Sequence, residues 1–331
     1  MQLQRVPHPT ALVTGGAGFV GSHLCDRLLA DGFRVICLDS FLTGRRANIA
    51  HLARDPRFEL IEQDVIDPAQ PAIRATHVFH LACAASPPHY QADPEHTILT
   101  NVLGTRNVLR LAEACGARFL LTSTSEVYGD PEIHPQHEDY RGSVSCTGPR
   151  ACYDEGKRAA ETLAFDFLRA GRCDTRVARI FNTYGPRMRS DDGRVVSNFI
   201  CQALAGEDIT VHGDGLQTRS FCFVDDLVDG LIRLMHSEQA RGLPVNLGNP
   251  EELRVREFVD LVIRKTASRS RVSHLPLPED DPKRRRPDIA RARDLLGWSP
   301  TTNLDAGLTE TIAWFRAEAK GLARRELVAA E

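Results

Sequence analysis

Tyr153 and Lys157, four residues apart in the stretch "YDEGK", have the side chains needed to remove a proton from an alcohol. Residues at positions i and i+4 share one face of a helix, so the lysine ammonium would lie beside the phenol. A positive charge there lowers the pKa of the phenol and could also hold a ribose hydroxyl. The pair therefore favours oxidation of a hydroxyl with loss of a hydride, although the same spacing also occurs on ordinary helix surfaces.

Glu126 is a second candidate for chemistry, because it stands where an acidic side chain is not expected. It follows Thr124 by two residues in "LTSTSEVYGD", where an apolar run typical of a buried strand ends. A carboxylate is costly to bury, so a strand that leaves the core has no structural need for one. We therefore expect Glu126 to serve a site beyond the end of this strand.

A glycine-rich turn near the N-terminus, "GGAGFVG", predicts a dinucleotide site. Its key glycines are Gly15, Gly18 and Gly21, which permit a tight turn, close approach of a pyrophosphate and close packing of the following helix. Asp39 ends the next strand, 24 residues after Gly15. A carboxylate there accepts hydrogen bonds from both ribose hydroxyls and repels a 2′-phosphate, which favours NAD over NADP. Asp64 ends the third strand and could contact the adenine ring, or it could be an exposed loop acid.

The elements that would position these residues alternate between strand and helix, which predicts an α/β fold with a Rossmann-type, doubly wound parallel sheet. Predicted helices cover Phe19–Ala30, Glu95–Ala114 and Gly148–Leu168. The predicted strands are Ala11–Thr14, Arg34–Asp39, Phe58–Gln63, His77–Ala82, Arg118–Thr124 and Thr175–Phe181.

After Gly185 the composition changes, and we expect a smaller C-terminal lobe that binds substrate. Val224–His236 and Val245–Leu247 should return to the main sheet, and the helix after Leu304 should fray at its end. The predicted division is residues 10–185, with returns near 222–247, for the NAD-binding domain; 186–221 and 248–316 for the lobe; and 317–331 for the frayed tail.

Composition narrows the functional class. The chain has 331 residues and a net charge of −3, so it does not predict a nucleic-acid surface. Nine cysteines, an odd number without a C-x-x-C pair, favour reduced thiols in a cytoplasmic protein. No stretch predicts a metal site, a signal peptide or a membrane span.

Together these motifs resemble the extended short-chain dehydrogenase/reductase family, from Thr10 to about Trp314. The resemblance implies tightly bound NAD and a nucleotide-linked sugar as substrate. It also implies that Tyr153 is the base, that Lys157 is its electrostatic partner and that Thr124 hydrogen-bonds the reacting oxygen. A homodimer through a four-helix interface is implied too, for which Val102, Leu109, Ala159 and Leu163 could supply apolar faces or could simply face the sheet.

Within that family the chain is similar to the UDP-glucuronate decarboxylases (UDP-xylose synthases), on stretches such as "TSTSEVYGDP", "GPRACYDEGKR", "ARIFNTYGPRM" and "KRRRPDIARAR". Sugar 4,6-dehydratases carry an Asp before the Glu, whereas this chain has Ser125, which cannot readily protonate a departing hydroxyl. The similarity implies oxidation at C4, loss of the C6 carboxylate as CO2, protonation at C5 and return of the hydride. Glu126 would support the reaction at the ring, and Arg285 would act near C5 and read the carboxylate.

Alternatives to this interpretation remain. The enzyme could be a 4,6-dehydratase or a 4-epimerase of the same fold, or a cofactor-binding module without catalysis. The basic run Lys283–Arg286 could be solvated or a nucleic-acid patch rather than part of the site. Two departures from the decarboxylase pattern, Cys83-Ala84 after the fourth strand and Ser40 beside the adenosine ribose, lie near the cofactor.

The resemblance also implies the residues that contact each ligand. The predicted catalytic residues are Thr124, Glu126, Tyr153, Lys157 and Arg285. The predicted cofactor contacts are Gly15, Gly18, Phe19, Val20, Gly21, Asp39, Ser40, Phe41, Thr43, Gly44, Asp64, Val65, Leu81, Ala82, Thr100, Thr122, Tyr153, Lys157, Thr183 and Arg189. The predicted UDP-sugar contacts are Ser86, Glu126, Asn182, Gly193, Arg194, Val195, Val196, Asn198, Thr210, Val211, His212, Arg219 and Arg285.

Overall fold

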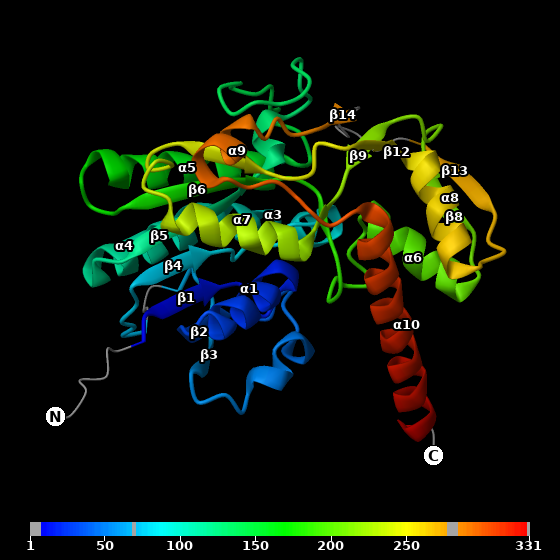
Figure 1. Ribbon diagram of the computed structural model, residues 1–331, viewed down its shortest axis with the longest axis horizontal. Coiled ribbons are helices and arrows are strands. Elements are labelled where there is room, and N and C mark those ends of the chain that lie inside the picture. Colours follow the sequence, from blue (N-terminus) through cyan, green and yellow to red (C-terminus); the bar gives the residue numbers. More distant parts are fainter. Residues whose placement is uncertain (1–7, 68–70, 277–283, 330–331) are drawn as a thin grey trace.

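A seven-stranded sheet forms the centre of the larger part of the molecule (Figure 1). The computed structural model describes residues 8–67, 71–276 and 284–329. Strand order is β11-β6-β5-β4-β1-β2-β3, and every pairing is parallel, as the sequence predicts. The order reverses between β1 and β4, so a crevice for ligands is expected at the carboxyl ends of these strands. The strands are β1 (Thr10–Thr14), β2 (Arg34–Asp39), β3 (Phe58–Glu62), β4 (His77–His80), β5 (Arg118–Thr124), β6 (Thr175–Ile180) and β11 (Pro244–Leu247).

Helices cover both faces of this sheet. Leu28 of α1 and Leu231 of α7 lie in one fully buried cluster, and Val108 of α4 and Ala164 of α5 lie in another on the opposite face. Each face is therefore sealed by apolar side chains at helical spacing. The helices of this part are α1 (Phe19–Ala30), α2 (Pro87–Ala92), α3 (Pro94–Leu99), α4 (Thr105–Cys115), α5 (Ala151–Arg169), α7 (Val224–His236) and α9 (Ala290–Leu296), with short turns η1 (Arg46–Asn48), η2 (Ala50–Leu52) and η4 (Ser125–Tyr128).

The single helix predicted over 95–114 is interrupted. A π-helical turn, η3 (Thr100–Gly104), separates α3 from α4. A Cβ atom at Gly104 would lie 2.6 Å from the Val65 side chain, so the chain packs there without room for a larger residue. Such π turns often mark functional sites, and this one brings Thr100 to the cavity described below.

The C-terminal segments form a lobe beside the sheet (Figure 1). Its core contains Phe199, Phe221 and Phe258, with the Phe221 and Phe258 rings 4.7 Å apart. Because β11 pairs with β6 and α7 packs on α1, these two segments belong to the large sheet; the exact domain boundaries stay a prediction. The remaining elements are β7 (Thr183–Tyr184), α6 (Val195–Ala205), β8 (Ile209–His212), β9 (Thr218–Ser220), β10 (Cys222–Phe223), β12 (Glu252–Arg254), α8 (Val255–Thr266), β13 (Val272–Leu275), β14 (Arg284–Arg285) and α10 (Leu304–Ala329).

Helix α10 begins at Leu304, as the sequence predicts, and continues to Ala329 (Figure 1). Fraying of its last residues stays a prediction. Of the helices in the described part of the chain, none combines the length and the apolar character that crossing a membrane requires. All nine cysteines are free thiols. Lys283, the first residue of the predicted basic run, lies outside the described residues.

His80 supports the cofactor side of the sheet from inside the core. Its ring nitrogens hydrogen-bond with Thr14 Oγ1 at 2.7 Å and Thr105 Oγ1 at 3.1 Å. The same Thr14 oxygen accepts hydrogen bonds from the backbone N–H groups of Leu81 and Ala82, which line the cavity. Burial, followed by the charge of Lys157, lowers the pKa of His80 to about 3.

Because His80 is buried and uncharged, we expect the folded protein to lose stability in acid. Between its unfolded pKa of 6.5 and its folded pKa of about 3, only the unfolded chain binds the proton, so the free energy of unfolding falls as pH falls. The slope from one such group reaches about 1.4 kcal/mol per pH unit. We expect urea unfolding of His80→Gln between pH 7 and pH 4 to depend less on pH than that of the unaltered protein.

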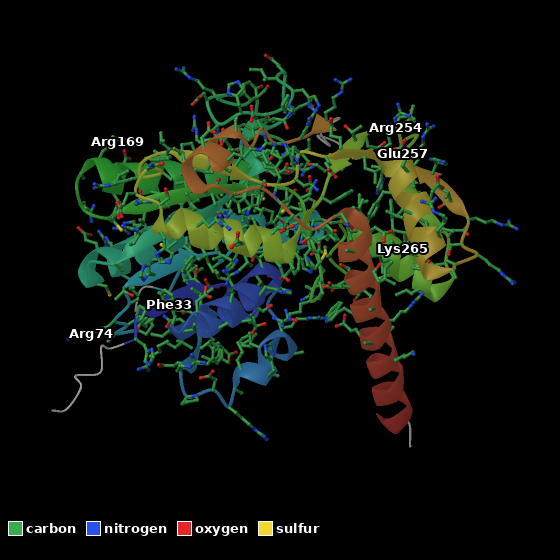
Figure 2. The ribbon with its side chains drawn as sticks, viewed as in Figure 1. Phe33, Arg74, Arg169, Arg254, Glu257 and Lys265 are labelled. Atoms are coloured by element: carbon green, nitrogen blue, oxygen red, sulfur yellow. The ribbon has the colours of Figure 1, made fainter. Side chains whose placement is uncertain are left out.

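His77 provides the internal reference for that experiment. It packs edge-on against Phe33 at the opposite end of the sheet, near the Phe33 label in Figure 2. Burial lowers the pKa of His77 to about 4, so it adds to the slope of both proteins equally. Parallel pH dependences for the two proteins would contradict the role given to His80.

Candidate active site

One large cavity lies where the carboxyl ends of the sheet strands face the C-terminal lobe. Its volume is about 580 Å³, within the range of small-molecule and cofactor sites. All five predicted catalytic residues line it. So does every predicted ligand contact except Phe41 and Val211. The sheet and the lobe therefore bring together residues that are up to about 270 positions apart in the chain.

Phe41 and Val211 are the two predicted contacts that do not reach the cavity wall. Val211 is 1% exposed and packs in the lobe core, because side chains alternate along β8 and its neighbours Thr210 and His212 face the cavity. Phe41 has a φ of +59° and places its ring under the Arg46 guanidinium, 4.3 Å from the ring centre. The alternation of side chains along "ITVH" could have shown, from the sequence alone, that Val211 does not face the ligand site.

The glycine-rich turn forms a close cradle at one end of the cavity. Gly15 has a φ of +71°, and a Cβ atom there would lie 3.0 Å from the backbone of Ala82. A Cβ atom at Gly21 would lie 2.1 Å from the Gly15 carbonyl oxygen, so α1 can approach the turn only without a side chain at this position. The start of α1 then presents its N–H groups to the cavity, which suits a pyrophosphate.

Asp39 stands beside that cradle with its carboxylate held in place. It is 6% exposed, and it accepts hydrogen bonds from the N–H groups of Ala17 at 2.9 Å and Phe41 at 2.8 Å. Burial raises the pKa of Asp39, and the two backbone donors oppose that shift without cancelling it. The geometry fits the carboxylate that holds a ribose in a dinucleotide site.

Asp64 lines the same end of the cavity and is held by a histidine that the sequence did not indicate. Its Oδ2 pairs with His96 Nε2 at 2.8 Å, and its Oδ1 accepts a hydrogen bond from the Ile66 N–H at 3.0 Å. His96 in turn lies 3.4 Å from the Thr100 hydroxyl. Asp64 is therefore an oriented acceptor rather than an exposed loop acid, and its contact with an adenine ring stays a prediction.

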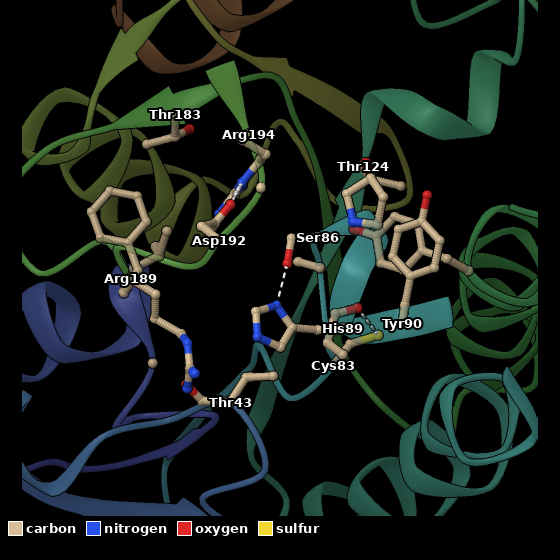
Figure 3. A pocket seen from close by; sticks show the side chains of 18 of the residues that line it. Thr43, Cys83, Ser86, His89, Tyr90, Thr124, Thr183, Arg189, Asp192 and Arg194 are labelled. Carbon is tan, nitrogen blue, oxygen red and sulfur yellow. Dashed lines mark hydrogen bonds and ion pairs between the residues drawn. The ribbon is translucent and has the colours of Figure 1, made fainter. Parts of the chain in front are cut away.

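Thr124, Tyr153 and Lys157 meet at the middle of the cavity. Lys157 is 4% exposed and donates a hydrogen bond to the Thr122 carbonyl at 2.9 Å. Its Nζ lies 5.9 Å from the centre of the Tyr153 ring. Tyr90, which was not predicted, stacks on Tyr153 with ring centres 5.0 Å apart and lies on the cavity wall (Figure 3).

The ionisation of this group differs from the sequence expectation. The pKa of Tyr153 is raised, first by burial and then by the Cys83 thiol, while a hydrogen bond with Thr124 acts in the opposite direction. Burial also lowers the pKa of Lys157. The expected lowering of the phenol pKa by lysine is thus outweighed in the protein alone, because desolvation favours the uncharged form of both groups.

Glu126 is held between two arginines. Arg285 donates to both of its carboxylate oxygens, at 2.9 and 3.2 Å, and Arg150 donates at 3.1 Å. Arg285 also donates to the Ser125 hydroxyl at 3.0 Å. Burial alone would raise the pKa of Glu126, but the charges of Arg285, Arg150 and Arg219 outweigh it and the pKa is lowered.

Arg150 was missed by the sequence analysis. It lies on the cavity wall three residues before Tyr153, so helical spacing places the two residues on one side of α5. Asp154, one residue beyond Tyr153, has a pKa raised to about 7, first by burial and then by the charge of Glu126. Glu126 is therefore ionised near neutral pH, whereas Asp154 keeps its proton up to a much higher pH than an ordinary aspartate does.

The opposite end of the cavity is formed by the lobe. Arg219 is 9% exposed and lines the wall together with Asn182, at the positions predicted for substrate contacts. Arg194 pairs with Asp192, as Figure 3 shows. A Cβ atom at Gly193 would lie 2.5 Å from Pro88, so the loop before α6 and the start of α2 meet across the cavity.

The chain resembles proteins of known activity over nearly its whole length. Residues 11–248 match the family described as "NAD dependent epimerase/dehydratase family". UDP-glucuronic acid decarboxylase 1 of Danio rerio is 54% identical over 317 residues, which cover 96% of this chain and 75% of that protein. UDP-glucuronic acid decarboxylase 4 of Arabidopsis thaliana is 54% identical over 310 residues, covering 94% and 69%.

Solved structures agree in fold. An epimerase from Methanothermobacter thermautotrophicus matches with a TM-score of 0.87 and 31% identity, over 96% of this chain and 95% of that one. UDP-glucuronic acid 4-epimerase from Bacillus cereus, solved with UDP-glucuronic acid and NAD, matches with a TM-score of 0.84 and 27% identity, over 93% and 99%.

The glycine cradle makes a direct prediction for NAD binding. Gly21→Ala would place a Cβ atom against the Gly15 carbonyl and push α1 away from the turn, so we expect at least about a hundredfold weaker NAD binding by calorimetry. Gly321→Ala is the matched control, since a Cβ atom there meets nothing within 4 Å. An unchanged Kd for NAD in Gly21→Ala would show that the cradle does not hold the cofactor.

Proposed function

The chain belongs to the NAD-dependent epimerase/dehydratase family, and from this premise we propose that it converts UDP-glucuronate to UDP-xylose and CO2. It is an NAD-dependent enzyme whose curated relatives are UDP-glucuronic acid decarboxylases. The observation that carries the proposal is the ionised Glu126, paired with Arg285 and Arg150 beside Ser125. A dehydratase needs an acid at the position of Ser125 to protonate the departing hydroxyl. Here that position has a serine hydroxyl, which accepts a hydrogen bond from Arg285.

The first step removes the C4 hydrogen and the proton of the C4 hydroxyl. The glycine turn and Asp39 would hold NAD, which would supply the hydride acceptor and, in its oxidised form, a positive charge. Tyr153 accepts the hydroxyl proton, and Thr124 hydrogen-bonds the same oxygen. Lys157, anchored to the Thr122 carbonyl, keeps a positive charge beside the phenol and can hold a ribose hydroxyl.

The second step is the loss of CO2. The C4 ketone lies β to the C6 carboxylate, so the C5–C6 bond can break with its electron pair delocalised into the ketone. Arg285 and Arg150 provide guanidinium groups on the cavity wall that can read the carboxylate before it leaves. Tyr90 lies beside them with a buried hydroxyl for which the described residues supply no hydrogen-bond partner, so it can donate to the same group.

The last steps protonate C5 and return the hydride to C4. Because the pKa of Glu126 is lowered, its carboxylate is ionised and is not the direct proton source at neutral pH. We propose that Glu126 and Arg285 orient a water molecule or the ring so that a proton reaches C5. Tyr153 then returns its proton to the C4 oxygen as the hydride comes back, and the site is restored.

Purified protein incubated with UDP-glucuronate tests the proposal. We expect CO2 and UDP-xylose in equal amounts, with a rate about 10²–10⁴-fold lower in Tyr153→Phe, because the variant lacks the group that exchanges the proton. Tyr140→Phe is the matched control, because it removes a phenol outside the cavity whose oxygen accepts a hydrogen bond from the Glu132 N–H. Dehydration of UDP-glucose, or a C4 epimer of UDP-glucuronate as the only product, would favour the rival activities.

We further propose a homodimer, and a cytosolic location that suits nine free thiols. Ile98 and Leu103, each 38% exposed, lie on α3 and η3, and Ala159 and Leu163 are half-buried on neighbouring α5. This apolar face supports the four-helix interface. Leu109 cannot contribute, since it is fully buried against the sheet.

Light scattering of the purified chain checks the dimer. We expect twice the chain mass at micromolar concentration, and a monomer for Leu103→Glu, because a carboxylate would be buried without a partner in the interface. Leu216→Glu, at a 48% exposed leucine of the C-terminal lobe, should remain a dimer. A monomeric unaltered protein would rule the interface out.

A further inference from the structure

The loop that follows β2 forms the rim of the adenosine end of the cavity. Ser40, Thr43, Gly44 and Asn48 line it. A Cβ atom at Gly44 would lie 2.5 Å from Asp39 Oδ1, so the loop folds tightly over the carboxylate that faces the ribose. Any ligand held by Asp39 is therefore enclosed by this loop.

The loop forms one hydrogen-bonded unit with the glycine-rich turn. The Arg45 N–H donates to the Ala17 carbonyl at 3.0 Å, and the Asn48 side chain donates to the same oxygen at 3.0 Å. The Ala17 N–H donates to Asp39. Movement of Arg45 would thus displace both the glycine-rich turn and Asp39.

Helix α10 reaches this loop from the C-terminal lobe. The Arg45 guanidinium forms an ion pair with Glu318 and lies 5.5 Å from the centre of the Trp314 ring. Both charged side chains are about three-quarters covered, at 24% and 21% exposure, so their pairing is screened less than a surface pair. Helix α10 packs on α6, which begins directly after Arg194 at the substrate end.

We propose that the Arg45–Glu318 pair, backed by Trp314, is a positioning link that retains NAD for the whole catalytic cycle. It joins the lobe that contacts substrate to the loop that encloses the adenosine end, so closure of one favours closure of the other. A second contact supports the same loop, since Arg189 of the cavity wall donates to the Thr43 carbonyl at 3.3 Å.

The proposed reaction explains why such a link matters. It rests on that function, because the reduced cofactor made at the first step must remain until the hydride returns to C4. If NADH leaves early, the ketone left after loss of CO2 is released unreduced. Retention therefore decides how much UDP-4-ketopentose escapes for each UDP-xylose formed.

Glu318→Gln tests the link, because it removes the charge while keeping the shape. We expect NAD to dissociate about tenfold faster from the preloaded holoenzyme, and the share of UDP-4-ketopentose and free NADH to rise. Salt near 1 M should speed dissociation from the unaltered protein toward the variant's rate, because it screens the pair. The NAD-free variant should remain folded, with a midpoint of thermal unfolding at most a few degrees lower, because one partly exposed ion pair is lost.

Asp305→Asn is the matched control on the same helix. Asp305 pairs with Lys265 of α8 at 2.6 Å, within the lobe, near the Lys265 label in Figure 2. This variant also loses one carboxylate of α10 but should retain NAD like the unaltered protein. Arg45→Lys should release NAD more slowly than Glu318→Gln but faster than the unaltered protein. It keeps the positive charge but lacks the planar group over Trp314.

NAD dissociation is measured without any sugar nucleotide, so its result does not depend on the proposed reaction. Equal dissociation rates in Glu318→Gln, Asp305→Asn and the unaltered protein would overturn the link even if UDP-xylose is made. Faster NAD loss in Glu318→Gln alone, with no decarboxylation by any form, would support the link and refute the proposed function.

Discussion

The arrangement of the candidate active site depends on the carboxylate of Glu126. It lies at the end of β5 and depends on two guanidinium groups that arrive from elsewhere, Arg150 from the start of α5 and Arg285 from β14. Removing one partner of a buried, hydrogen-bonded ion pair costs about 3–5 kcal/mol, because the other charge stays buried. The C-terminal lobe must therefore dock on the sheet for this carboxylate to be stable, and docking is what closes the cavity.

The small sheet β12-β9-β14 provides the contact through which the lobe docks on the large sheet. In its register Arg285 of β14 stands beside Arg219 of β9, so one pairing places both arginines of the substrate end. The Ser220 hydroxyl donates to the Arg285 carbonyl at 3.2 Å, which holds the short strand to its neighbour. The contacts that we propose for Arg285 and Arg219 with a nucleotide sugar would thus come from adjacent residues whose spacing is set by backbone hydrogen bonds.

Much of this could be predicted because its signals are local. The "GGAGFVG" turn, Asp39 and the helical pair Tyr153 and Lys157 each depend on spacing within one or two elements. Arg150, Tyr90 and His96 were missed because their roles arise from contacts between elements, with Glu126, Tyr153 and Asp64. The π turn before α4 was missed for a similar reason, since it reflects the packing of Gly104 on Val65 rather than a break in apolar periodicity.

The ionisation of Tyr153 and Lys157 shows what burial adds to a motif. Desolvation raises the pKa of the phenol and lowers that of the ammonium, so both groups shift toward their uncharged forms in the protein alone. A positive charge beside the phenol would oppose this shift for Tyr153, and oxidised nicotinamide would supply such a charge. In the proposed reaction the phenol would therefore be the stronger base beside the oxidised cofactor and would hold its proton more tightly beside the reduced one. Burial of the pair would thus keep that proton on Tyr153 until it is returned to the C4 oxygen.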